Sequence, residues 1–291
     1  MAAVYVLVNA AGDGDPREVV EAFLRHDVAP IVLDTETPVA AASAARDAVA
    51  AGAERLVAVG GDGAVHLAAN AVAGTDTVLG VVPLGTGNDF ARALGLLDGG
   101  LDAQVERASA APAAIDAIRS NHGWITTVAT LGFSGDVTAR ANAMSWPRGQ
   151  RRYALATLLQ LPQLRTYEVE VEVDGQPVTS ETTLLAIGNT AYFGGGMKVC
   201  PDADPADGAA QVVSIGDVSR RTFVRVFPKV FSGSHVDRPE VTVASGSVVT
   251  IDGADADLWA DGERLGPLPA RLEVVRGALR VAGANLPSGR G

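Results

Sequence analysis

The N-terminal third of the chain alternates between short apolar runs and stretches with helical spacing, and this alternation restricts the fold more than any other feature. The apolar runs have the length of strands, and the stretches between them carry apolar residues three and four positions apart. The expected strands are 4–8, 30–34, 55–60 and 77–83, and the expected helices are 16–26, 40–52, 64–74 and 88–96. Apolar strands separated by helices predict a parallel sheet covered on both faces, and therefore an α/β fold.

The rest of the chain has a different pattern, with strand-like segments joined by turns. Residues 167–173, YEVEVEV, alternate strictly between apolar and charged side chains, which is typical of a half-buried antiparallel strand. Helical spacing recurs at 151–164 and 220–231. The sequence therefore predicts an α/β domain over 1–118 and a mainly antiparallel β domain over 119–281.

Charge and cysteine content limit the partners and the compartment. The chain has 291 residues, a formal net charge of -11 and one cysteine, Cys200. Nucleic acid is disfavoured as a partner because phosphate backbones need clustered Lys and Arg, and the overall charge gives no general attraction to anionic membranes. Without a disulfide framework, a signal peptide or an apolar run of about 18 residues, we expect a cytoplasmic protein with no transmembrane segment.

Glycine-rich loops follow three of the expected strands, at 9–15, 60–64 and 83–89. Ligands of open parallel sheets bind beyond the carboxyl ends of the strands, so these loops are expected at the ligand-binding edge. Glycine lets backbone amides approach an anion closely, and the N-terminus of a following helix adds a favourable potential. The loops therefore predict a cradle for a triphosphate, with Thr86 and Asn88 as additional donors.

One carboxylate, that of Asp62, lies inside the glycine turn GGDG. Asp-Gly occurs seven times in the chain, and an isolated copy usually forms only a turn. Asp62 differs from an isolated copy because a strand precedes it and a helix follows it. It could accompany a Mg²⁺ bound with the anion, hold the turn, or contact a nucleotide hydroxyl, and the residues alone leave these alternatives open. Neither a P-loop motif nor a G-x-G-x-x-G motif is present.

These motifs resemble a known family. GGDGAVHLAANAV together with VVPLGTGNDFARALGL is similar to the lipid kinase family built on the diacylglycerol kinase catalytic domain, which includes sphingosine and ceramide kinases and, more distantly, NAD kinases. Residues 186–215 resemble the family's second-domain stretch, with its GN, GGG and DG, and residues 258–282 resemble its closing segment around D-G-E. The likeness spans nearly the whole chain in the correct order.

The resemblance implies an α/β domain of the NAD kinase type followed by a β-sandwich domain, with residues 282–291 returning to the first domain. It also implies that ATP binds at the glycine loops. The residues it implies for the nucleotide are Asn9, Thr35, Gly60, Gly61, Asp62, Gly63, Ala64, His66, Leu67, Gly85, Thr86, Gly87, Asn88 and Asp89.

The resemblance further implies a catalytic carboxylate and a metal. Asp261 occupies the position of the proposed general base, and the neighbouring Glu263 is a second candidate. A structural Mg²⁺ of some members maps onto the side chain of Asp207 and the carbonyls of Asp204 and Ala209. Without the family resemblance, the Asp-Gly pair at Asp261 would indicate only another hairpin turn.

The chain also departs from the family pattern. Leu67 stands where a carboxylate is usual, Ala64 replaces a hydroxyl residue, and Gln211 replaces an acidic residue. The N-terminal loop reads Asn9-Ala10-Ala11-Gly12 in place of N-P-x-S-G. These departures from the family pattern leave two alternatives open, a changed substrate or reduced activity.

The leading hypothesis is a kinase that uses ATP and Mg²⁺ to phosphorylate a primary hydroxyl of diacylglycerol or a similar lipid, at the inner membrane surface. One alternative is a soluble alcohol or nucleotide acceptor, and another is a weakly active lipid- or nucleotide-binding protein. The oligomeric state stays open, with a homodimer as one alternative. The basic and aromatic stretch 144–161 either meets the membrane or begins a helix that covers the β domain.

Overall fold

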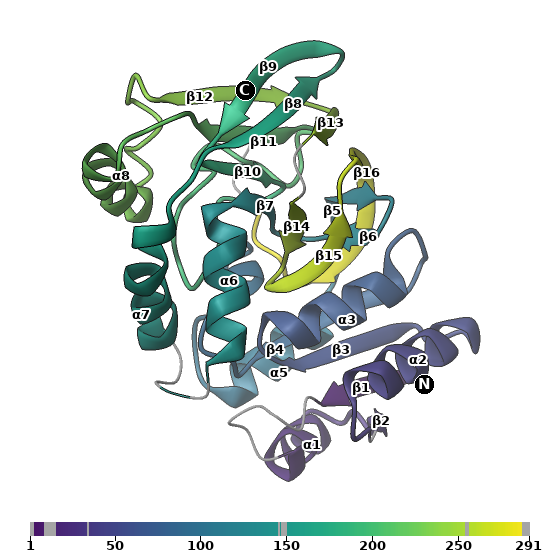
Figure 1. Cartoon of the computed structure of the whole chain (residues 1–291). Helices are drawn as coiled ribbons and strands as arrows, with labels where there is room; N and C mark the ends of the chain where they lie inside the picture. The colour runs from purple at the N-terminus through teal and green to yellow at the C-terminus, as the bar shows by residue number, and fades with distance from the viewer. Residues whose placement is uncertain are drawn as a thin grey trace. The chain divides into compact units, whose positions relative to one another are not determined.

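The computed structural model describes residues 3–8, 16–33, 35–144, 146, 150–253 and 256–286. The chain divides into two compact units (Figure 1). The first comprises Met1–Ala117 with Arg276–Gly291, and the second comprises Ile118–Val275.

The first unit is built on a parallel sheet whose strands follow the order β2-β1-β3-β4. Its strands are β1 (Val4–Val8), β2 (Ile31–Leu33), β3 (Arg55–Gly60) and β4 (Val78–Pro83). Its helices are α1 (Pro16–Arg25), α2 (Pro38–Ala50), α3 (Asp62–Val72), α4 (Asp89–Ala93) and α5 (Leu101–Ser109). The prediction of a parallel α/β fold is therefore confirmed, whereas α5 was not expected from the sequence.

Buried valines of the sheet form one core of the first unit with α1 and α5. Val6, Val57 and Val82 from three strands pack with Phe23 of α1 and Val105 of α5. These residues are fully or almost fully buried, so removing their apolar surface from water stabilises the layered arrangement. The continuous apolar runs in the sequence thus correspond to strands covered by helices.

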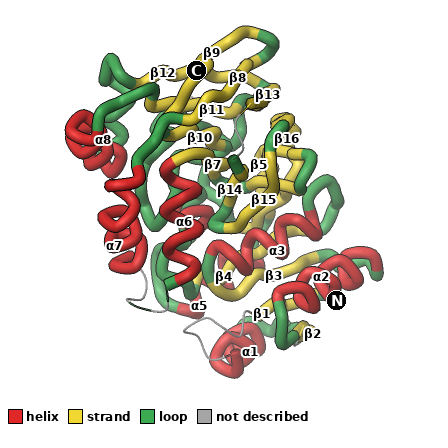
Figure 2. The backbone as a smooth tube through the Cα atoms, in the orientation of Figure 1, coloured by secondary structure: helices red, strands yellow, loops and turns green. Residues whose placement is uncertain are grey.

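The second unit contains two antiparallel sheets, and Figure 2 colours their strands yellow. One sheet has the order β12-β11-β10-β7-β14-β15, and in the other β13 lies between β8 and β16 while β9 pairs with β8. The strands of the first sheet are β7 (Val128–Gly132), β10 (Leu184–Gly188), β11 (Ala210–Ile215), β12 (Val241–Gly246), β14 (Asp257–Ala260) and β15 (Glu263–Pro267). Those of the second are β8 (Tyr167–Val173), β9 (Gln176–Thr182), β13 (Val248–Gly253) and β16 (Ala270–Ala282), with β5 (Pro112–Ser120) and β6 (Gly123–Ile125) at its side.

Strand β16 takes part in both units. Its first residues pair with β13 in antiparallel fashion, and Arg280 and Val281 at its end pair in parallel with Val78 and Leu79 of β4. The closing segment of the chain is thereby hydrogen-bonded to the sheet of the first unit.

The two sheets of the second unit enclose a sandwich core. Val169 and Val171 of β8 point inward, with the glutamates between them exposed, as the strict alternation predicts. They pack with Ile251 of β13 and with Leu185 and Leu258 of the other sheet. The β-sandwich implied by the family resemblance is thus confirmed.

Helices cover the other face of the β7-containing sheet. They are α6 (Phe133–Ala143), α7 (Gln150–Gln160), η1 (Leu161–Gln163), α8 (Arg220–Val226) and η2 (Phe227–Phe231). Phe133 of α6 packs edge-to-face on Phe223 of α8, with ring centroids 4.7 Å apart. Helix α6 is a correction to the sequence prediction, which placed only strand-like segments and turns there. No helix in the described ranges combines the length and hydropathy that a membrane crossing requires.

Candidate functional site

Two glycine loops meet at the carboxyl ends of β3 and β4. The strands pair in parallel with Gly60 opposite Pro83, so both loops leave the sheet at the same edge. A Cβ atom added to Gly85 would collide with the Cα atom of Gly61, and it would lie 2.8 Å from Oδ1 of Asn88. The two backbones are therefore in direct contact, and a side chain at position 85 would separate them.

The side chain of Asn88 fixes the second loop. Asn88 has a left-handed backbone, with φ 51°, and its Nδ2 donates to the carbonyl of Gly85 at 2.6 Å. The amide of Gly85 donates in return to Oδ1 of Asn88 at 3.1 Å. This reciprocal pair holds residues 85–88 in one shape before a ligand arrives, which lowers the conformational entropy that binding would cost.

The carboxylate of Asp62 connects the two loops. Asp62 lies in the first turn of α3, and its Oδ1 accepts a hydrogen bond from the amide of Phe90 at 3.3 Å. Phe90 belongs to α4, the helix that follows the second loop. Of the explanations left open for a carboxylate inside the glycine turn, the one in which Asp62 holds the loops has this contact in its favour.

The first two turns of α3 carry three further residues implied for the nucleotide. Ala64 is buried in the helix packing, whereas His66 and Leu67 are half-buried. The His66 ring lies 3.4 Å from Nδ2 of Asn70, and the same Nδ2 donates to the His66 carbonyl at 3.0 Å. Ala64 faces the packed side of the helix, so its side chain contacts the interior of the unit and not solvent.

The remaining nucleotide residues are spread more widely. Thr86 is exposed at the tip of the second loop, and Asp89 is buried with its Oδ1 4.0 Å from Nε of Arg92. Thr35 follows β2, which pairs with β1 at the edge of the sheet and is separated by β1 from the glycine loops. Asn9 and the loop 9–15 lie outside the described residues.

In the second unit, Asp261 lies at the tip of the hairpin formed by β14 and β15. Asp261 and Gly262 both have positive φ angles, 51° and 87°, as two-residue hairpin turns require. The Asp261 carboxylate is buried and accepts hydrogen bonds from the amides of Thr126 and Thr127, at 3.1 and 2.9 Å, and from their hydroxyls, at 3.2 and 2.6 Å. These donors fix the orientation of the Asp261 carboxylate. Glu263, two residues on, is exposed.

The loop implied for Mg²⁺ is held by its own carboxylates. Asp204 accepts from the amide of Ala206 at 3.0 Å, and Asp207 accepts from the amide of Ala209 at 2.8 Å. These are local turn contacts typical of aspartate. The described ranges contain no group of three or more His, Cys, Asp or Glu side chains close enough to share a metal ion, so a metal here would also need backbone carbonyls.

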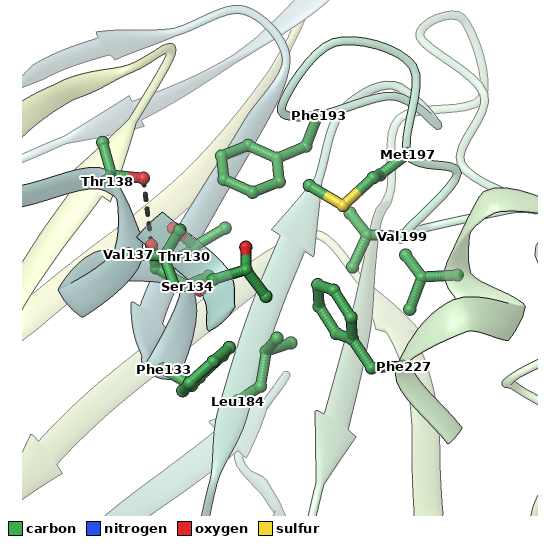
Figure 3. Close-up of a pocket in the computed structure, with 12 residues that line it drawn as sticks. Thr130, Phe133, Ser134, Val137, Thr138, Leu184, Phe193, Met197, Val199 and Phe227 are labelled. Atoms are coloured by element: carbon green, nitrogen blue, oxygen red, sulfur yellow. Dashed lines mark hydrogen bonds between the residues drawn. The ribbon is translucent and has the colours of Figure 1, made fainter. Parts of the chain in front are cut away.

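An apolar pocket lies between the helical layer and the β7-containing sheet (Figure 3). Its empty volume is about 460 Å³, including the opening to solvent. Figure 3 shows Phe193, Met197 and Phe227 around the pocket, with Val137 of α6 on another side. The lining residues are Thr130, Phe133, Ser134, Val137, Thr138, Thr157, Leu184, Phe193, Met197, Val199, Phe227 and Val230.

Three consecutive glycines shape one wall of this pocket. Gly194, Gly195 and Gly196 all have positive φ angles, and the residues on either side of them, Phe193 and Met197, pair through both backbone hydrogen bonds. The turn projects both flanking side chains into the pocket. The GGG motif of the sequence therefore belongs to the pocket wall.

One polar atom in the pocket has no hydrogen-bond partner among the residues that the structure describes. Thr130 is fully buried, and its hydroxyl makes no hydrogen bond with any residue in the described part of the chain. A buried unpaired hydroxyl costs about 1–3 kcal/mol, so a ligand that accepts from it would recover part of that free energy. Sequence reasoning missed this pocket, because its residues come from segments far apart in the chain.

Helix α6 is fixed by a polar contact to β8. The hydroxyl of Tyr167 donates to Oδ2 of Asp136 at 2.9 Å, and Nε2 of Gln160 in α7 lies 3.4 Å from the same oxygen. Burial, together with the Asp136 carboxylate, raises the pKa of Tyr167 to about 12, although the nearby Arg165 opposes this shift. The hydroxyl therefore stays protonated and donating at neutral pH, which keeps α6 against the sheet.

Comparison with known proteins shows the family. Residues 3–120 match the family model described as "Diacylglycerol kinase catalytic domain", and residues 127–283 match the "YegS C-terminal NAD kinase beta sandwich-like domain". The chain is 37% identical over 246 residues to the diacylglycerol kinase of Mycobacterium tuberculosis (strain ATCC 25618 / H37Rv), covering 80% of this chain and 78% of that relative. The chain belongs to the diacylglycerol kinase family.

Other members and neighbours agree with this assignment. The diacylglycerol kinase of Bacillus subtilis (strain 168) is 31% identical over 240 residues, covering 80% of this chain and 78% of the relative. A crystal structure of a diacylglycerol kinase from Bacillus anthracis str. Sterne has a TM-score of 0.73 at 18% identity, covering 98% of this chain and 97% of that chain. An NAD kinase from Archaeoglobus fulgidus in complex with ATP has a TM-score of 0.56 at 12% identity, covering 97% of this chain and 93% of the other, which shows likeness in fold.

As a member of the diacylglycerol kinase family, the chain is a kinase, an enzyme that transfers a phosphoryl group. Such a reaction needs a rigid cradle for phosphates and a group that accepts the proton of the attacking hydroxyl. The glycine loops of the first unit have the rigidity of such a cradle. The second unit contains the buried carboxylate of Asp261 and the apolar pocket.

Proposed function

We propose that this enzyme transfers the γ-phosphate of ATP to a hydroxyl group of diacylglycerol or a similar lipid. The observation that carries the lipid part of the proposal is the apolar pocket beneath α6. Its walls are phenylalanine, leucine, valine and methionine side chains, which suit a hydrocarbon chain. The hydroxyl of Thr130 suits an ester carbonyl, which can accept a hydrogen bond.

The glycine loops are proposed to bind the phosphates of ATP. Gly61, Gly63, Gly85 and Gly87 would let backbone amides approach phosphate oxygens, and the α3 N-terminus would add a favourable potential for their charge. The internal contacts of Asn88 and Asp62 support this role because they set the loop shape in the free protein. Family membership supports ATP as the phosphate donor.

Asp261 is proposed to accept the proton of the acceptor hydroxyl. In a loose phosphoryl-transfer transition state the acceptor hydroxyl becomes acidic only as the new O–P bond forms. Proton transfer is then late, and a weak base held in the correct position is sufficient. Glu263 is the exposed carboxylate closest in sequence and is proposed as its partner.

Mg²⁺ is proposed to bind the loop around Asp207. The side chain of Asp207 and the carbonyls of Asp204 and Ala209 offer only oxygen atoms, which are the ligands Mg²⁺ prefers. When bound there, the ion would supply structural rigidity to the loop that leads into β11. We further propose that the enzyme works in the cytoplasm and visits the inner membrane surface transiently.

The proposal is tested by incubating the purified chain with γ-labelled ATP, Mg²⁺ and a panel of diacylglycerols, other lipid alcohols and soluble alcohols. Labelled phosphatidic acid or a close analogue is the expected product. Label on a soluble alcohol would support the alternative acceptor class. No labelled product despite ATP binding would support the weakly active alternative suggested by Leu67 and Ala64.

Two glycine variants test the phosphate cradle. Gly85→Ala should abolish ATP binding and lower the stability, because its Cβ collides with Gly61. Gly63→Ala meets no atom within 4 Å, so the fold should tolerate it. Loss of ATP affinity in Gly63→Ala at unchanged stability would show that the nucleotide itself approaches this position. Full ATP affinity in both variants would exclude the loops as the nucleotide site.

Two pocket variants test the lipid site. Thr130→Val removes the unpaired hydroxyl, so it should not destabilise the free protein but should raise the KM for diacylglycerol. Val137→Phe adds bulk to the pocket and should reduce turnover of long-chain diacylglycerol more than that of short-chain substrate. Ala143→Phe places the same ring at an exposed site of the same helix and is the control. Unchanged KM and chain-length preference in both pocket variants would exclude the pocket.

A further inference from the structure

The hairpin turn of Asp261 lies at one edge of the β7-containing sheet. Strand β7 has β10 on one side and β14 on the other, and both neighbours run antiparallel to it (Figure 1). The carboxyl ends of β10 and β14 therefore flank the start of β7. Asn189 directly follows β10 and Asp261 directly follows β14. Since Thr126 and Thr127 directly precede β7, the topology places Asn189 on one side of this pair and the Asp261 turn on the other.

A single peptide group connects the side chains of Asn189 and Asp261. The carbonyl of Thr126 and the amide of Thr127 belong to the same planar trans peptide group, so they point in opposite directions. Nδ2 of Asn189 donates to this carbonyl at 3.1 Å. The amide at the other end donates to Oδ1 of Asp261 at 2.9 Å. The two side chains therefore hold the two ends of one peptide group.

The main chain of Asn189 contacts the following peptide group as well. Its backbone amide donates to the carbonyl of Thr127 at 2.8 Å. This bond continues the ladder between β10 and β7, in which Gly188 is paired with Val128. A change of the Asn189 side chain therefore leaves the main-chain bond in place, and only the contact to the Thr126 carbonyl is lost.

These contacts are shielded from water. Asn189 has no exposed surface, and Thr126 and Thr127 have 1% and 3% of their surface exposed. Water therefore does not replace a donor that is lost at the Thr126 carbonyl, and a buried carbonyl without a donor is costly. In such surroundings hydrogen bonds at the two ends of a peptide group polarise each other, so a donor on the carbonyl strengthens the amide as a donor. The side chain of Asn189 thus strengthens the contact between Thr127 and Asp261.

The apolar pocket and Asp261 use the same part of this sheet. Thr130 lines the pocket and lies three residues beyond Thr127, which is roughly 10 Å along a strand that rises about 3.3 Å per residue. The segment that follows Asn189 contains the glycine turn of the pocket wall. A lipid in the pocket would therefore have its hydroxyl group within reach of the carboxylate that Asn189 holds in place.

We propose that Asn189 is a positioning residue for phosphoryl transfer, which orients the Asp261 carboxylate through the peptide group between Thr126 and Thr127. The inference rests on the proposed role of Asp261 as the proton acceptor. A carboxylate accepts a proton only from a hydroxyl within hydrogen-bond distance, about 2.6–3.2 Å, so a small rotation of the peptide group would slow the transfer. Because Asn189 acts through Asp261, loss of its side chain should lower kcat and leave the binding of ATP and lipid unchanged.

Two variants test the side chain of Asn189. Asn189→Ser is smaller and loses the donor to the Thr126 carbonyl, and Asn189→Leu has nearly the same size but no donor. With diacylglycerol as acceptor, kcat should fall about tenfold or more in each variant, whereas the KM for ATP and for diacylglycerol should change less than about twofold. Thr190→Val is the control and should leave kcat unchanged, because it removes a buried hydroxyl that has no hydrogen-bond partner among the residues with described positions.

A double-mutant cycle separates positioning of Asp261 from a purely structural role. When Asn189→Ser is added to Asp261→Asn, kcat should fall by less than about twofold, because the carboxylate on which Asn189 acts is already absent. Thermal denaturation of all the variants checks that each is folded. If the two losses in kcat instead multiply, Asn189 acts independently of Asp261 and the proposal is overturned.

The amide signal of Thr127 in the NMR spectrum of the ¹⁵N-labelled full chain tests the contact without catalysis. In wild type this amide should be protected from hydrogen exchange. Asn189→Ser should move its proton signal upfield and speed its exchange about tenfold or more, whereas Thr190→Val should change neither.

This measurement distinguishes the inference from the proposed function. If wild type phosphorylates no lipid, the proposed function fails, while the Thr127 signal still decides whether Asn189 holds the peptide group that orients Asp261. The positioning role is overturned if the Thr127 amide is unprotected in wild type or unchanged in Asn189→Ser. Wild-type kcat in folded Asn189→Ser and Asn189→Leu would also overturn it.

Discussion

Two Asp-Gly hairpins of the second unit have the same turn conformation and a similar hydrogen-bond pattern in different surroundings. Asp174-Gly175 joins β8 to β9, and Asp261-Gly262 joins β14 to β15. All four residues have positive φ angles, between 50° and 87°. Each aspartate also reaches out of its own hairpin to the connection between two other strands.

The acceptor pattern is nearly the same in the two hairpins. Asp174 accepts from Ser247 and from the amide of Val248 at 2.9 Å, where β12 leads into β13. Asp261 accepts from two consecutive threonines, where β6 leads into β7. Asp174 is exposed, whereas Asp261 has only 6% of its surface exposed. A turn with this hydrogen bonding does not require burial, so the burial of Asp261 needs a separate explanation, which the proposed catalytic role would supply.

The two hairpins are expected to differ most in how far the free energy of unfolding falls when the carboxylate is removed. Asp261→Ala leaves buried donors without an acceptor and should lower the free energy of unfolding by about 3 kcal/mol or more. Asp174→Ala leaves donors that water can reach, so it should lower the free energy of unfolding by only about 1 kcal/mol. Urea denaturation measures both. Equal losses in the two variants would show that burial adds nothing to the role of Asp261.

Activity separates the two hairpins further. Asp261→Asn keeps the size of the side chain but weakens its ability to accept a proton, so kcat should fall by about a hundredfold or more while ATP binding is retained. Asp174→Asn makes the same change at the exposed hairpin and should leave kcat unchanged. Normal turnover by folded Asp261→Asn would exclude Asp261 as the proton acceptor.

A smaller effect is predicted for the hydroxyls that hold Asp261. Thr127→Val removes a hydrogen bond of 2.6 Å and should lower the free energy of unfolding by about 1–2 kcal/mol. Thr126→Val removes a longer contact of 3.2 Å to the same carboxylate and should cost less. If the position of Asp261 matters for catalysis, kcat should also fall more in Thr127→Val than in Thr126→Val. A larger effect of Thr126→Val in both measurements would contradict the geometry.

The backbone of the two turns is predicted to behave identically. Gly175 and Gly262 have φ angles of 76° and 87°, and a Cβ atom at either would meet no atom within 4 Å. Gly175→Ala and Gly262→Ala should therefore each lower the free energy of unfolding by about 1 kcal/mol, because of backbone strain alone. Thermal denaturation of the pair is the measurement. Unequal costs would mean that the turns themselves, and not only the carboxylates, differ.

The sequence predicted the first unit more completely than the second. Strands β3 and β4, with the glycine loops that follow them, are local patterns in which a few consecutive residues determine the conformation. Register then brings Gly61 against Gly85, because parallel neighbours end at the same edge. The residues proposed for phosphate binding could therefore be named from the sequence, although holding the turn was only one of several roles left open for Asp62.

Helix α6 and the pocket could not be predicted in the same way. The α6 sequence FSGDVTARANA contains Gly, Asp, Ser and Thr, which are poor helix formers, and its helical state depends on packing. Phe133 packs on Phe223, and Asp136 accepts from Tyr167, so partners distant in the chain stabilise the helix. The pocket has the same non-local origin, since Thr130 and Val230 meet only after folding. Likewise, burial distinguishes Asp261 from Asp174, and the shared Asp-Gly pair does not encode burial.

The smallest predicted effect is the contribution of the exposed hairpin to the pH dependence of the free energy of unfolding. Hydrogen bonds from Val248 and Ser247 lower the pKa of Asp174 below its ordinary value of 3.8. In the unfolded chain this carboxyl takes up a proton first as the pH falls, so its contribution to stability is present above the unfolded pKa and is lost as the pH falls through the folded one. The stability difference between wild type and Asp174→Asn should therefore be constant near neutral pH and shrink at acid pH. Urea denaturation of both proteins across this range measures it. A difference that instead grew toward low pH would mean that the folded hairpin favours protonated Asp174, contrary to its hydrogen bonds.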